Sequence, residues 1–305
     1  MEIGFVLVTL GVGLLWVGSE VLVHYAQLLS DHFKISHSVI GLSFIALGTS
    51  MPELFTNVIA RMRDASGAIT LGSVLGSNTA NIAFVLATAT LIQPFSVPKY
   101  LKKFHLPLVL IITLLFGLTL LQTQMSRIDG VCLLAVGILA LIYLLKKTPA
   151  RKEEALRRSK VWLDILIICV SMAMILYGAH LFLDGALKIA TFFNIPDRII
   201  SLTMIAIGTS LPEWATAIIS SIRKKYTLAL ALVLGSNIMN LFIITGISAL
   251  IRPFPIDKSF LMIDFPVMAG FTFLLYLFSK KAQFTRPVGA IFFALYIAYL
   301  AFLVG

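Results

Sequence analysis

Long apolar stretches follow one another along the whole chain, separated by short polar loops. Ten of them reach about the length of a bilayer-spanning helix. They cover residues 3–29, 38–60, 68–92, 106–122, 128–145, 161–190, 198–222, 227–250, 260–279 and 287–304. Of the 305 residues, 59% are hydrophobic and 12% are charged, which is more apolar surface than a soluble fold buries. The sequence therefore predicts an all-α polytopic membrane protein with ten transmembrane helices and almost no β structure.

Lysine and arginine gather in the loops that follow the first, third, fifth, seventh and ninth of these spans. Those loops hold 17 of the 24 basic residues. Because cytoplasmic loops of membrane proteins are enriched in lysine and arginine, we expect these loops to lie in the cytosol and both termini to lie outside the cell membrane. The same bias accounts for the net charge of +10, so we expect the lipid bilayer, and no nucleic acid, as a partner.

Two blocks of sequence each occur twice, and the distance between the two occurrences is nearly the same for both blocks. ALGTSMPE at residues 46–53 returns as AIGTSLPE at 206–213, an offset of 160 residues. LGSNTANI at 75–82 returns as LGSNIMNL at 234–241, an offset of 159. Internal similarity at a fixed offset indicates that the chain contains two copies of one structural unit.

Each copy holds five predicted spans, which is an odd number. The second copy therefore enters the membrane from the opposite side. We predict two inverted five-helix repeats at residues 1–145 and 161–305, joined by a short basic cytosolic linker at 146–160. Folds of this kind bind their substrate near the middle of the membrane, where interrupted helices from the two repeats meet.

A proline and a glutamate stand side by side within an apolar span of each copy, as Pro52 and Glu53 and as Pro212 and Glu213. Proline lacks an amide hydrogen, so the helix bends or opens there and frees a carbonyl. A freed carbonyl in hydrocarbon needs another partner or a polar cavity. A carboxylate in such a span costs roughly 2.5–3.5 kcal/mol on insertion scales, so its repetition in both copies indicates a function.

Further oxygen-bearing side chains surround these glutamates in the sequence pattern. In each copy a threonine lies four residues before the glutamate with a serine next to it, and a serine and an asparagine share one face of the following span. The candidate side chains are Thr49, Ser50, Glu53, Ser77 and Asn81 in the first copy and Thr209, Ser210, Glu213, Ser236 and Asn240 in the second. Oxygen ligands with carboxylates suit Ca²⁺ or Na⁺ and do not suit zinc or copper. A protonated glutamate that bonds a neighbouring helix is the structural alternative for one motif, and the repetition argues against it.

The motifs GTSMPE, GTSLPE, GSNTAN and GSNIMN resemble the paired α-repeats of the sodium/calcium exchangers, in the cation/calcium antiporter superfamily. The resemblance covers nearly the whole chain and implies a compact prokaryotic-type member without a large regulatory loop. It implies that Glu53 and Glu213 are the central shared ligands. It also implies that the carbonyls of Ala46 and Ala206 help the two threonines to hold ions, and that the four serines line sodium sites.

Asn81 matches the family pattern, whereas Asn240 stands where relatives commonly carry aspartate. Proton-coupled relatives typically have asparagine in place of the threonine of GTS, so GTS in both copies favours sodium. The potassium-dependent branch uses extra acidic residues that this chain lacks. We therefore expect exchange of Na⁺ for Ca²⁺ by alternating access, at about three Na⁺ per Ca²⁺. A neutral exchange of about two for one, and a proton-coupled antiporter of Ca²⁺ or Mn²⁺, stay as alternatives.

Two other classes of protein fit the sequence less well. A midplane site within an inverted repeat is typical of a carrier and not of a channel. An intramembrane enzyme would need an activated nucleophile or a cofactor motif, and neither accompanies the glutamates. We therefore expect neither catalysis nor a cofactor, with Ca²⁺ and Na⁺ as the transported ions. We expect a single chain to suffice for transport and leave the oligomeric state open.

The first and sixth spans are long and contain glycine, and we expect them to slide against a fixed core. Each carries an acid and a histidine four residues apart: Glu20 with His24, and His180 with Asp184. A local ion pair, or solvated groups on a mobile helix, is the main interpretation. A pH-sensitive latch between the two helices is the alternative.

Overall fold

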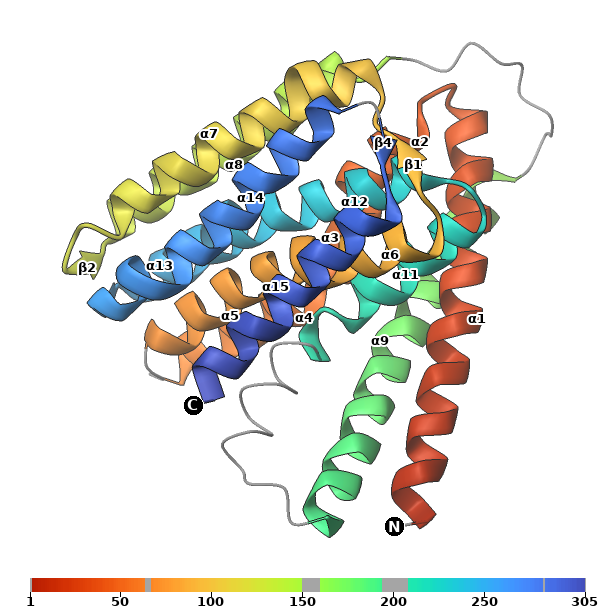
Figure 1. The fold of residues 1–305 in the computed structure, drawn as a ribbon, viewed down its shortest axis with the longest axis horizontal. Helices are drawn as coiled ribbons and strands as arrows, with labels where there is room; N and C mark the ends of the chain where they lie inside the picture. The colour runs from red at the N-terminus through yellow and green to blue at the C-terminus, as the bar shows by residue number, and fades with distance from the viewer. Residues whose placement is uncertain (1, 64–66, 150–159, 194–207, 282, 305) are drawn as a thin grey trace.

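The computed structural model describes residues 2–63, 67–149, 160–193, 208–281 and 283–304, and nearly all of them are helical (Figure 1). Eight helices in this part of the chain are long and apolar enough to cross a membrane, or nine if one bent pair counts as a single span. The prediction of an all-α polytopic membrane protein is thus confirmed. The count of ten stays a prediction, because the first half of the span expected at 198–222 lies outside the described residues up to position 207.

The spans are built from consecutive helical segments, some of which are π-helical and carry the symbol η. Those of the first half are α1 (Glu2–His32), α2 (His37–Ile40), η1 (Gly41–Ile45), α3 (Ala46–Thr49), α4 (Met51–Met62), α5 (Gly67–Ala80), η2 (Asn81–Leu86), α6 (Ala87–Ile92), η3 (Leu101–His105), α7 (Leu106–Thr119) and α8 (Arg127–Lys147). Those of the second half are α9 (Val161–Phe192), α11 (Leu211–Ile222), α12 (Tyr226–Ile238), η4 (Met239–Ile244), α13 (Thr245–Ile251), η5 (Phe260–Asp264), α14 (Phe265–Lys280) and α15 (Arg286–Val304).

The two longest helices, α1 and α9, pack along each other and project from the rest of the molecule (Figure 1). Glycine permits their close approach. A Cβ atom at Gly11 would lie 2.6 Å from the backbone nitrogen of Phe182, and one at Gly178 would lie 2.9 Å from the nitrogen of Leu15. Small residues allow two membrane helices to touch through their backbones. Any side chain at these positions would therefore push the pair apart.

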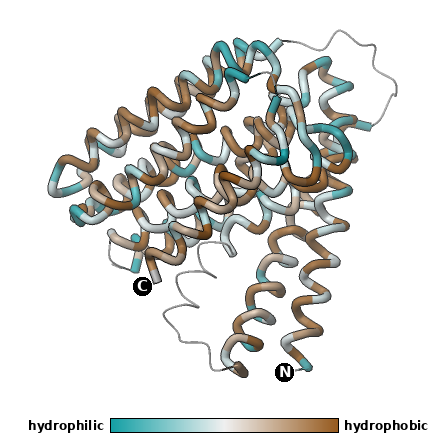
Figure 2. The backbone as a smooth tube through the Cα atoms, viewed as in Figure 1, coloured by the Kyte–Doolittle hydropathy of each residue, from teal (hydrophilic) through white to brown (hydrophobic). Residues whose placement is uncertain are grey.

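Two spans form the centre of the bundle. In the span from α5 to α6, 72% of the most apolar window is buried by protein, and in the span from α12 to α13 the share is 89%. The other long helices reach only 22–44%, because one side of each faces the lipid. Figure 2 shows the corresponding pattern: the helical shafts are mostly apolar, and the hydrophilic residues gather at helix ends and loops. Polar side chains on the two central spans are thus shielded from both lipid and water.

Local features recur in the same order in both halves. Six-residue π-helical segments, η2 and η4, interrupt the central spans, and five-residue segments, η3 and η5, begin the spans that follow. Hydropathy did not predict them, because the spans are apolar on nearly all sides and have no polar face whose shift would reveal an extra residue in a turn. The recurrence agrees with two copies of one unit, while the boundaries of the repeats stay a prediction.

Four strands of two residues each complete the described chain: β1 (Phe95–Ser96), β2 (Gln124–Met125), β3 (Phe254–Pro255) and β4 (Gln283–Phe284). Each pairs with a strand of the other half. Phe95 lies opposite Phe284, and Gln124 lies opposite Pro255, in antiparallel register. Figure 1 places β1 with β4 and β2 at opposite ends of the bundle. These short ladders therefore link the two halves at both ends.

Candidate cation site between the two central spans

The candidate site begins at a break in the second span. The helices His37–Thr49 and Met51–Met62 meet at Ser50 with a bend of 43°. Ser50 has φ −85° and ψ 7°, and Ser210 has nearly the same values, −89° and 4°. Pro52 lies in the first turn of α4, where a missing amide hydrogen breaks no helical bond. The expected interruption is therefore present at Ser50, and the same local backbone follows at Ser210.

A new helix begins after Ser50, and the glutamate lies in its first turn. Glu53 and Glu213 occupy equivalent places in α4 and α11, and each is only 1% exposed. Glu53 also lies close enough to Glu213 for direct electrostatic interaction. The fold thus brings together, in the interior, two carboxylates that are 160 residues apart in the chain.

Hydroxyl groups from both halves surround the Glu213 carboxylate. Ser50 donates a hydrogen bond to its Oε1 atom over 3.1 Å, and Ser236 donates to the same atom over 3.3 Å. The hydroxyl of Thr49 also reaches this carboxylate. Two of these three groups come from the opposite half of the chain. Glu213 is therefore held by both copies of the motif.

The other glutamate has a different environment. The side chain of Thr209 hydrogen-bonds to Glu53, and Thr49 lies beside Glu213, so each carboxylate has the threonine of the opposite copy next to it. Ser77 and Thr209 share a hydrogen bond of 3.2 Å between their hydroxyls. The Oγ1 atom of Thr49 donates to the carbonyls of Ile45 at 3.1 Å and Ala46 at 3.4 Å. Seven predicted residues thus form one connected cluster.

The three remaining predicted side chains and two predicted carbonyls are placed as follows. Asn81 donates from Nδ2 to Oδ1 of Asn237 at 3.1 Å, and Ser210 and Asn240 are buried with 0% and 1% exposure. The carbonyl of Ala46 accepts the amide of Ser50 at 3.0 Å, next to the break. Ala206 lies outside the described residues. The ligand role implied for each of these groups stays a prediction.

Several buried oxygens of this cluster carry no hydrogen bond within the described part of the chain. They are Oε2 of Glu53, Oε2 of Glu213, Oγ of Ser210, Oδ1 of Asn81 and Oδ1 of Asn240. Buried polar atoms normally have a partner, since an unsatisfied one costs free energy. Oxygens are the atoms that Ca²⁺ and Na⁺ accept as ligands, whereas Nδ2 of Asn240, which also lacks a partner in the described part of the chain, is a donor and does not bind a cation. The described residues contain no group of three or more His, Cys, Asp or Glu side chains that could hold a metal ion, so the site rests on two carboxylates and on hydroxyl and amide groups.

Sequence reasoning missed an asparagine pair at the centre of the molecule. Asn78 donates to the carbonyl of Asn237 at 3.2 Å, and Asn237 donates to the carbonyl of Asn78 at 3.3 Å. This reciprocal pair joins α5 to α12 and presents the Oδ1 atom that holds Asn81. The signal was available, because GSN occurs in both copies, but only the tertiary structure shows that the two asparagines meet.

Two further residues fix the helices that carry the glutamates. Asn57, on α4, donates to the carbonyl of Glu53 at 2.7 Å and to the hydroxyl of Ser73 at 3.3 Å. Trp214, next to Glu213, donates from its indole to Thr88 at 3.0 Å and stacks on Phe84. Both contacts reach across to the α5–α6 span, so this central span orients both glutamate-bearing helices.

The acid–histidine pairs on the two long helices do not form the predicted local ion pairs. Glu20 makes a salt bridge with Arg223, which follows α11, and Asp184 makes one with Lys188 at 3.0 Å. His24 packs edge-on against Tyr25. Asp184 thus has a local ion pair, but with Lys188, and both histidines are exposed, as the interpretation of solvated groups on these helices expects. The Glu20–Arg223 pair joins α1 to the helix of Glu213, and the latch stays untested.

The fold and the site together define the class of membrane protein to which this chain belongs. A bundle of membrane-spanning helices encloses two carboxylates together with hydroxyl and amide groups, contributed by both halves of the chain. Such a buried, all-oxygen site is the arrangement found in membrane carriers of small cations.

Comparison with known proteins identifies the family. The family model described as sodium/calcium exchanger protein matches residues 3–146 and again 163–305. An uncharacterized membrane protein of Methanocaldococcus jannaschii is 34% identical over 294 residues, covering 96% of this chain and 95% of the relative. The sodium/calcium exchanger MaX1 of Methanosarcina acetivorans is 28% identical over 356 residues, with 99% of each covered. A solved structure of the sodium-calcium exchanger NCX_Mj superposes with a TM-score of 0.86 at 32% identity, covering 98% of both chains.

The chain therefore belongs to the sodium/calcium exchanger family. It is a compact multi-pass membrane cation antiporter of the cation/calcium antiporter superfamily, as the resemblance of its motifs predicts.

Proposed function

We propose that this protein exchanges Na⁺ for Ca²⁺ across the cell membrane by alternating access, with Glu53 and Glu213 as the shared ligands. One observation carries the proposal: two buried carboxylates interact with each other and are surrounded by hydroxyl groups from both halves of the chain. A dehydrated divalent cation needs this density of negative charge and this flexibility of oxygen ligands. The relatives that are named as sodium/calcium exchangers support Na⁺ and Ca²⁺ as the two transported ions.

The resemblance to the exchanger family implies about three Na⁺ for each Ca²⁺, and charge balance shows what such an exchange requires. With both glutamates ionised, the empty site carries two negative charges, which one Ca²⁺ neutralises. A third Na⁺ leaves the site with one positive charge, which is costly at the midplane unless oxygen dipoles offset it. The unsatisfied oxygens of Ser210, Asn81 and Asn240 are available for this role. Because Asn240 is uncharged, neutral exchange of about two for one is the competing stoichiometry.

The two stoichiometries differ in their response to membrane potential. The purified protein is reconstituted in liposomes, and Na⁺-driven ⁴⁵Ca²⁺ uptake is measured while K⁺ and valinomycin clamp the potential. An exchange of about three for one moves one net charge, so an inside-positive potential speeds Ca²⁺ uptake that is coupled to Na⁺ efflux. Uptake that ignores the potential contradicts this scheme and leaves the neutral one.

A proton-coupled exchanger of Ca²⁺ or Mn²⁺ is the second candidate function. The observation in its favour is that Glu53 and Glu213 are buried and interact with each other, since such a pair can bind and release protons. The same liposomes distinguish the two functions. We expect a Na⁺ gradient to drive ⁴⁵Ca²⁺ movement and a pH gradient alone to drive none. The reverse result replaces Na⁺ by protons in the proposal.

The proposed orientation places the basic linker in the cytosol and both termini outside. Its support is the concentration of lysine and arginine in alternate loops. Single cysteines at positions 127 and 152, in a chain that lacks its native cysteines, are labelled with an impermeant thiol reagent on intact cells. We expect labelling at position 127 and none at 152. Labelling at 152 contradicts the orientation.

A further inference from the structure

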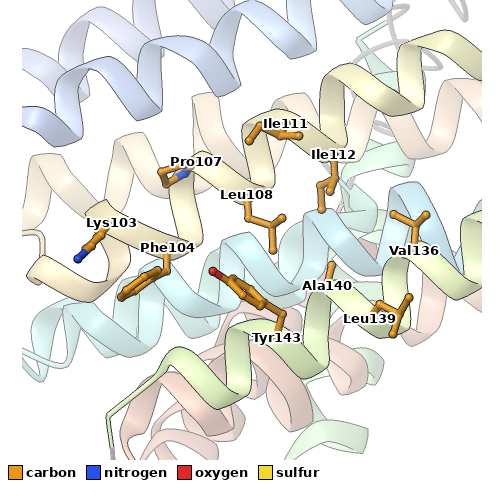
Figure 3. Close-up of a pocket in the computed structure, with 10 residues that line it drawn as sticks. All are labelled: Lys103, Phe104, Pro107, Leu108, Ile111, Ile112, Val136, Leu139, Ala140 and Tyr143. Atoms are coloured by element: carbon orange, nitrogen blue, oxygen red, sulfur yellow. The ribbon is translucent and has the colours of Figure 1, made fainter.

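A groove on the outer surface runs between two neighbouring helices of the first half. It has a volume of about 410 Å³ and lies between the η3–α7 span and α8 (Figure 3). Apolar side chains line most of its length, including Leu108, Ile111 and Leu139, and the latter two are 54% and 65% exposed. In a membrane this surface faces the acyl chains of the lipid.

One end of the groove is cationic. Lys103 lines it, and Figure 3 shows Lys103 and Phe104 together at that end, with the hydroxyl of Tyr143 directed toward them. The ammonium groups of Lys103 and Lys147 lie 5.3 and 5.2 Å from the centre of the Phe104 ring, and Lys147 is also 5.6 Å from that of Tyr143. Neither lysine forms a salt bridge with a carboxylate of the described residues. Two ammonium groups thus lie beside the Phe104 ring near the end of α8, one of them on the groove and the other next to its lining.

The groove has the length of one lipid leaflet. From Lys103 to Ile112 the chain rises about 13 Å at helical pitch. One half of the hydrocarbon core is about 15 Å thick. The basic end lies at the end of the helices, and the apolar part extends toward their middle. A molecule that fills the groove therefore has an anionic group at the membrane surface and a hydrocarbon chain below it.

The second half of the molecule contains the same groove without the charge. A cavity of about 340 Å³ lies between α14 and α15 and is lined by Pro266 and Phe302 among other apolar residues. At the repeat offset of 159, Pro266 corresponds to Pro107, Phe302 to Tyr143, and Met262 to Lys103. Helix packing alone thus produces a groove at both places. The cationic end is a separate feature of the first one.

We propose that the groove between α7 and α8 binds an anionic phospholipid. Its phosphate lies between Lys103 and Lys147, the Tyr143 hydroxyl donates to it, and one acyl chain packs along Leu108, Ile111 and Leu139. Basic residues at the cytoplasmic ends of membrane helices bind anionic headgroups in this way. The second groove, which has no cation, accepts acyl chains without selecting the headgroup.

The test compares two pairs of lysines on the same protein. Lys103→Gln with Lys147→Gln removes the proposed headgroup contacts. Lys280→Gln with Lys281→Gln removes two charges that also lie over aromatic rings, at 4.7 Å from Tyr276 and 5.8 Å from Phe278, but that line neither groove. Each variant and the unmodified protein are titrated in detergent with dioleoyl phosphatidylglycerol or dioleoyl phosphatidylcholine. Bound lipid is counted by native mass spectrometry, and Tm is followed in parallel.

We expect phosphatidylglycerol to bind the unmodified protein and the Lys280/Lys281 variant equally and to raise Tm in both. The Lys103/Lys147 variant should bind it about tenfold more weakly and bind phosphatidylcholine unchanged. Equal loss in both variants, or equal binding of the two lipids to the unmodified protein, overturns the proposal. A dimer that the added lipid does not dissociate, and that the Lys103/Lys147 variant loses, assigns the groove to a second copy of the chain instead.

A second variant covers the case in which the lysine pair impairs folding. Ile111→Trp fills the groove from the exposed side and leaves both lysines in place. Weaker binding of phosphatidylglycerol to this variant, by a similar factor, supports an acyl chain in the groove. Unchanged binding overturns it.

Discussion

The helices α4 and α11 begin with almost the same residues, yet the molecule packs them differently. Both contain 12 residues, with proline second and glutamate third. In α4 three side chains are buried, and in α11 nine are. The three in α4 are Glu53, Asn57 and Arg61, which a spacing of four places on one face. α11 is thus enclosed on most sides, while α4 turns one polar face inward and leaves apolar side chains exposed.

The hydrogen bonds of the two halves differ in the same sense. Glu213 accepts from Ser50 and Ser236, whereas Ser77, the counterpart of Ser236, bonds to Thr209 instead. Asn81 is held by Asn237, while both amide atoms of Asn240 lack a bond within the described residues. The difference teaches that the motif places the glutamate, and that the neighbouring helices decide what the glutamate binds.

The largest expected effect tests whether both helices serve one site despite this difference. Glu53→Gln and Glu213→Gln should each reduce Na⁺-driven ⁴⁵Ca²⁺ flux by about 100-fold or more, because each removes one of two charges that offset a dehydrated divalent cation. Circular dichroism and size-exclusion chromatography verify folding. Since an unpaired buried carboxylate is costly, Tm should stay equal or rise. Near-normal flux in either variant shows that the two glutamates do not share a cation.

The next effect distinguishes the two asparagines. Asn240→Asp adds a carboxylate at a side chain that makes no hydrogen bond in the described part of the chain, and should lower the KM for Na⁺ about tenfold by giving a further sodium a charged ligand. Asn81→Asp loses the donor that binds Asn237, and should lower stability by about 1–3 kcal/mol. Flux at varied Na⁺ and thermal unfolding measure the two. Similar changes in KM and in stability for both variants would contradict the proposed difference between the two asparagines.

A smaller effect separates the two serines at the helix breaks. Ser50→Ala removes a hydrogen bond to the Glu213 carboxylate and should destabilise the ion-free protein by about 1–2 kcal/mol. Ser210→Ala removes a hydroxyl that has no hydrogen-bond partner in the described part of the chain and should change stability by less than about 0.5 kcal/mol. Thermal unfolding without Na⁺ or Ca²⁺ compares them. A larger loss of stability in Ser210→Ala than in Ser50→Ala would contradict the difference in hydrogen bonding between the two serines.

The smallest effect concerns the link between the long helices and the core. Arg223→Gln breaks the pair with Glu20, whose side chains are 59% and 29% exposed respectively, and should cost no more than about 1 kcal/mol. Lys224→Gln, the next residue, is the matched control for the lost charge. We expect flux of the Arg223 variant to stay within about threefold of the control at pH 6 and pH 8. A pH-dependent difference larger than this would support the latch between the two helices.

The class of protein was accessible from the sequence because hydropathy and motif spacing are local properties. Apolar stretches of membrane length predicted all the long helices that the structure describes, to within a few residues for most of their bounds. The repeated GTS–PE and GSN motifs identified the glutamates, threonines, serines and asparagines that gather in the interior. Pro52 and Pro212 correctly marked where new helices begin. None of this required knowing which spans touch.

The partners of these residues were decided by the tertiary structure alone. Ser50 bonds to a glutamate 163 residues away, and Asn78 bonds to a residue 159 positions away. Glu20 was expected to pair within its own helix and instead pairs with Arg223. A sequence pattern reports which face of a helix a side chain occupies, but hydrogen bonds and ion pairs form with whichever group the packing brings nearest. The two copies therefore share a motif but differ in their hydrogen-bond partners.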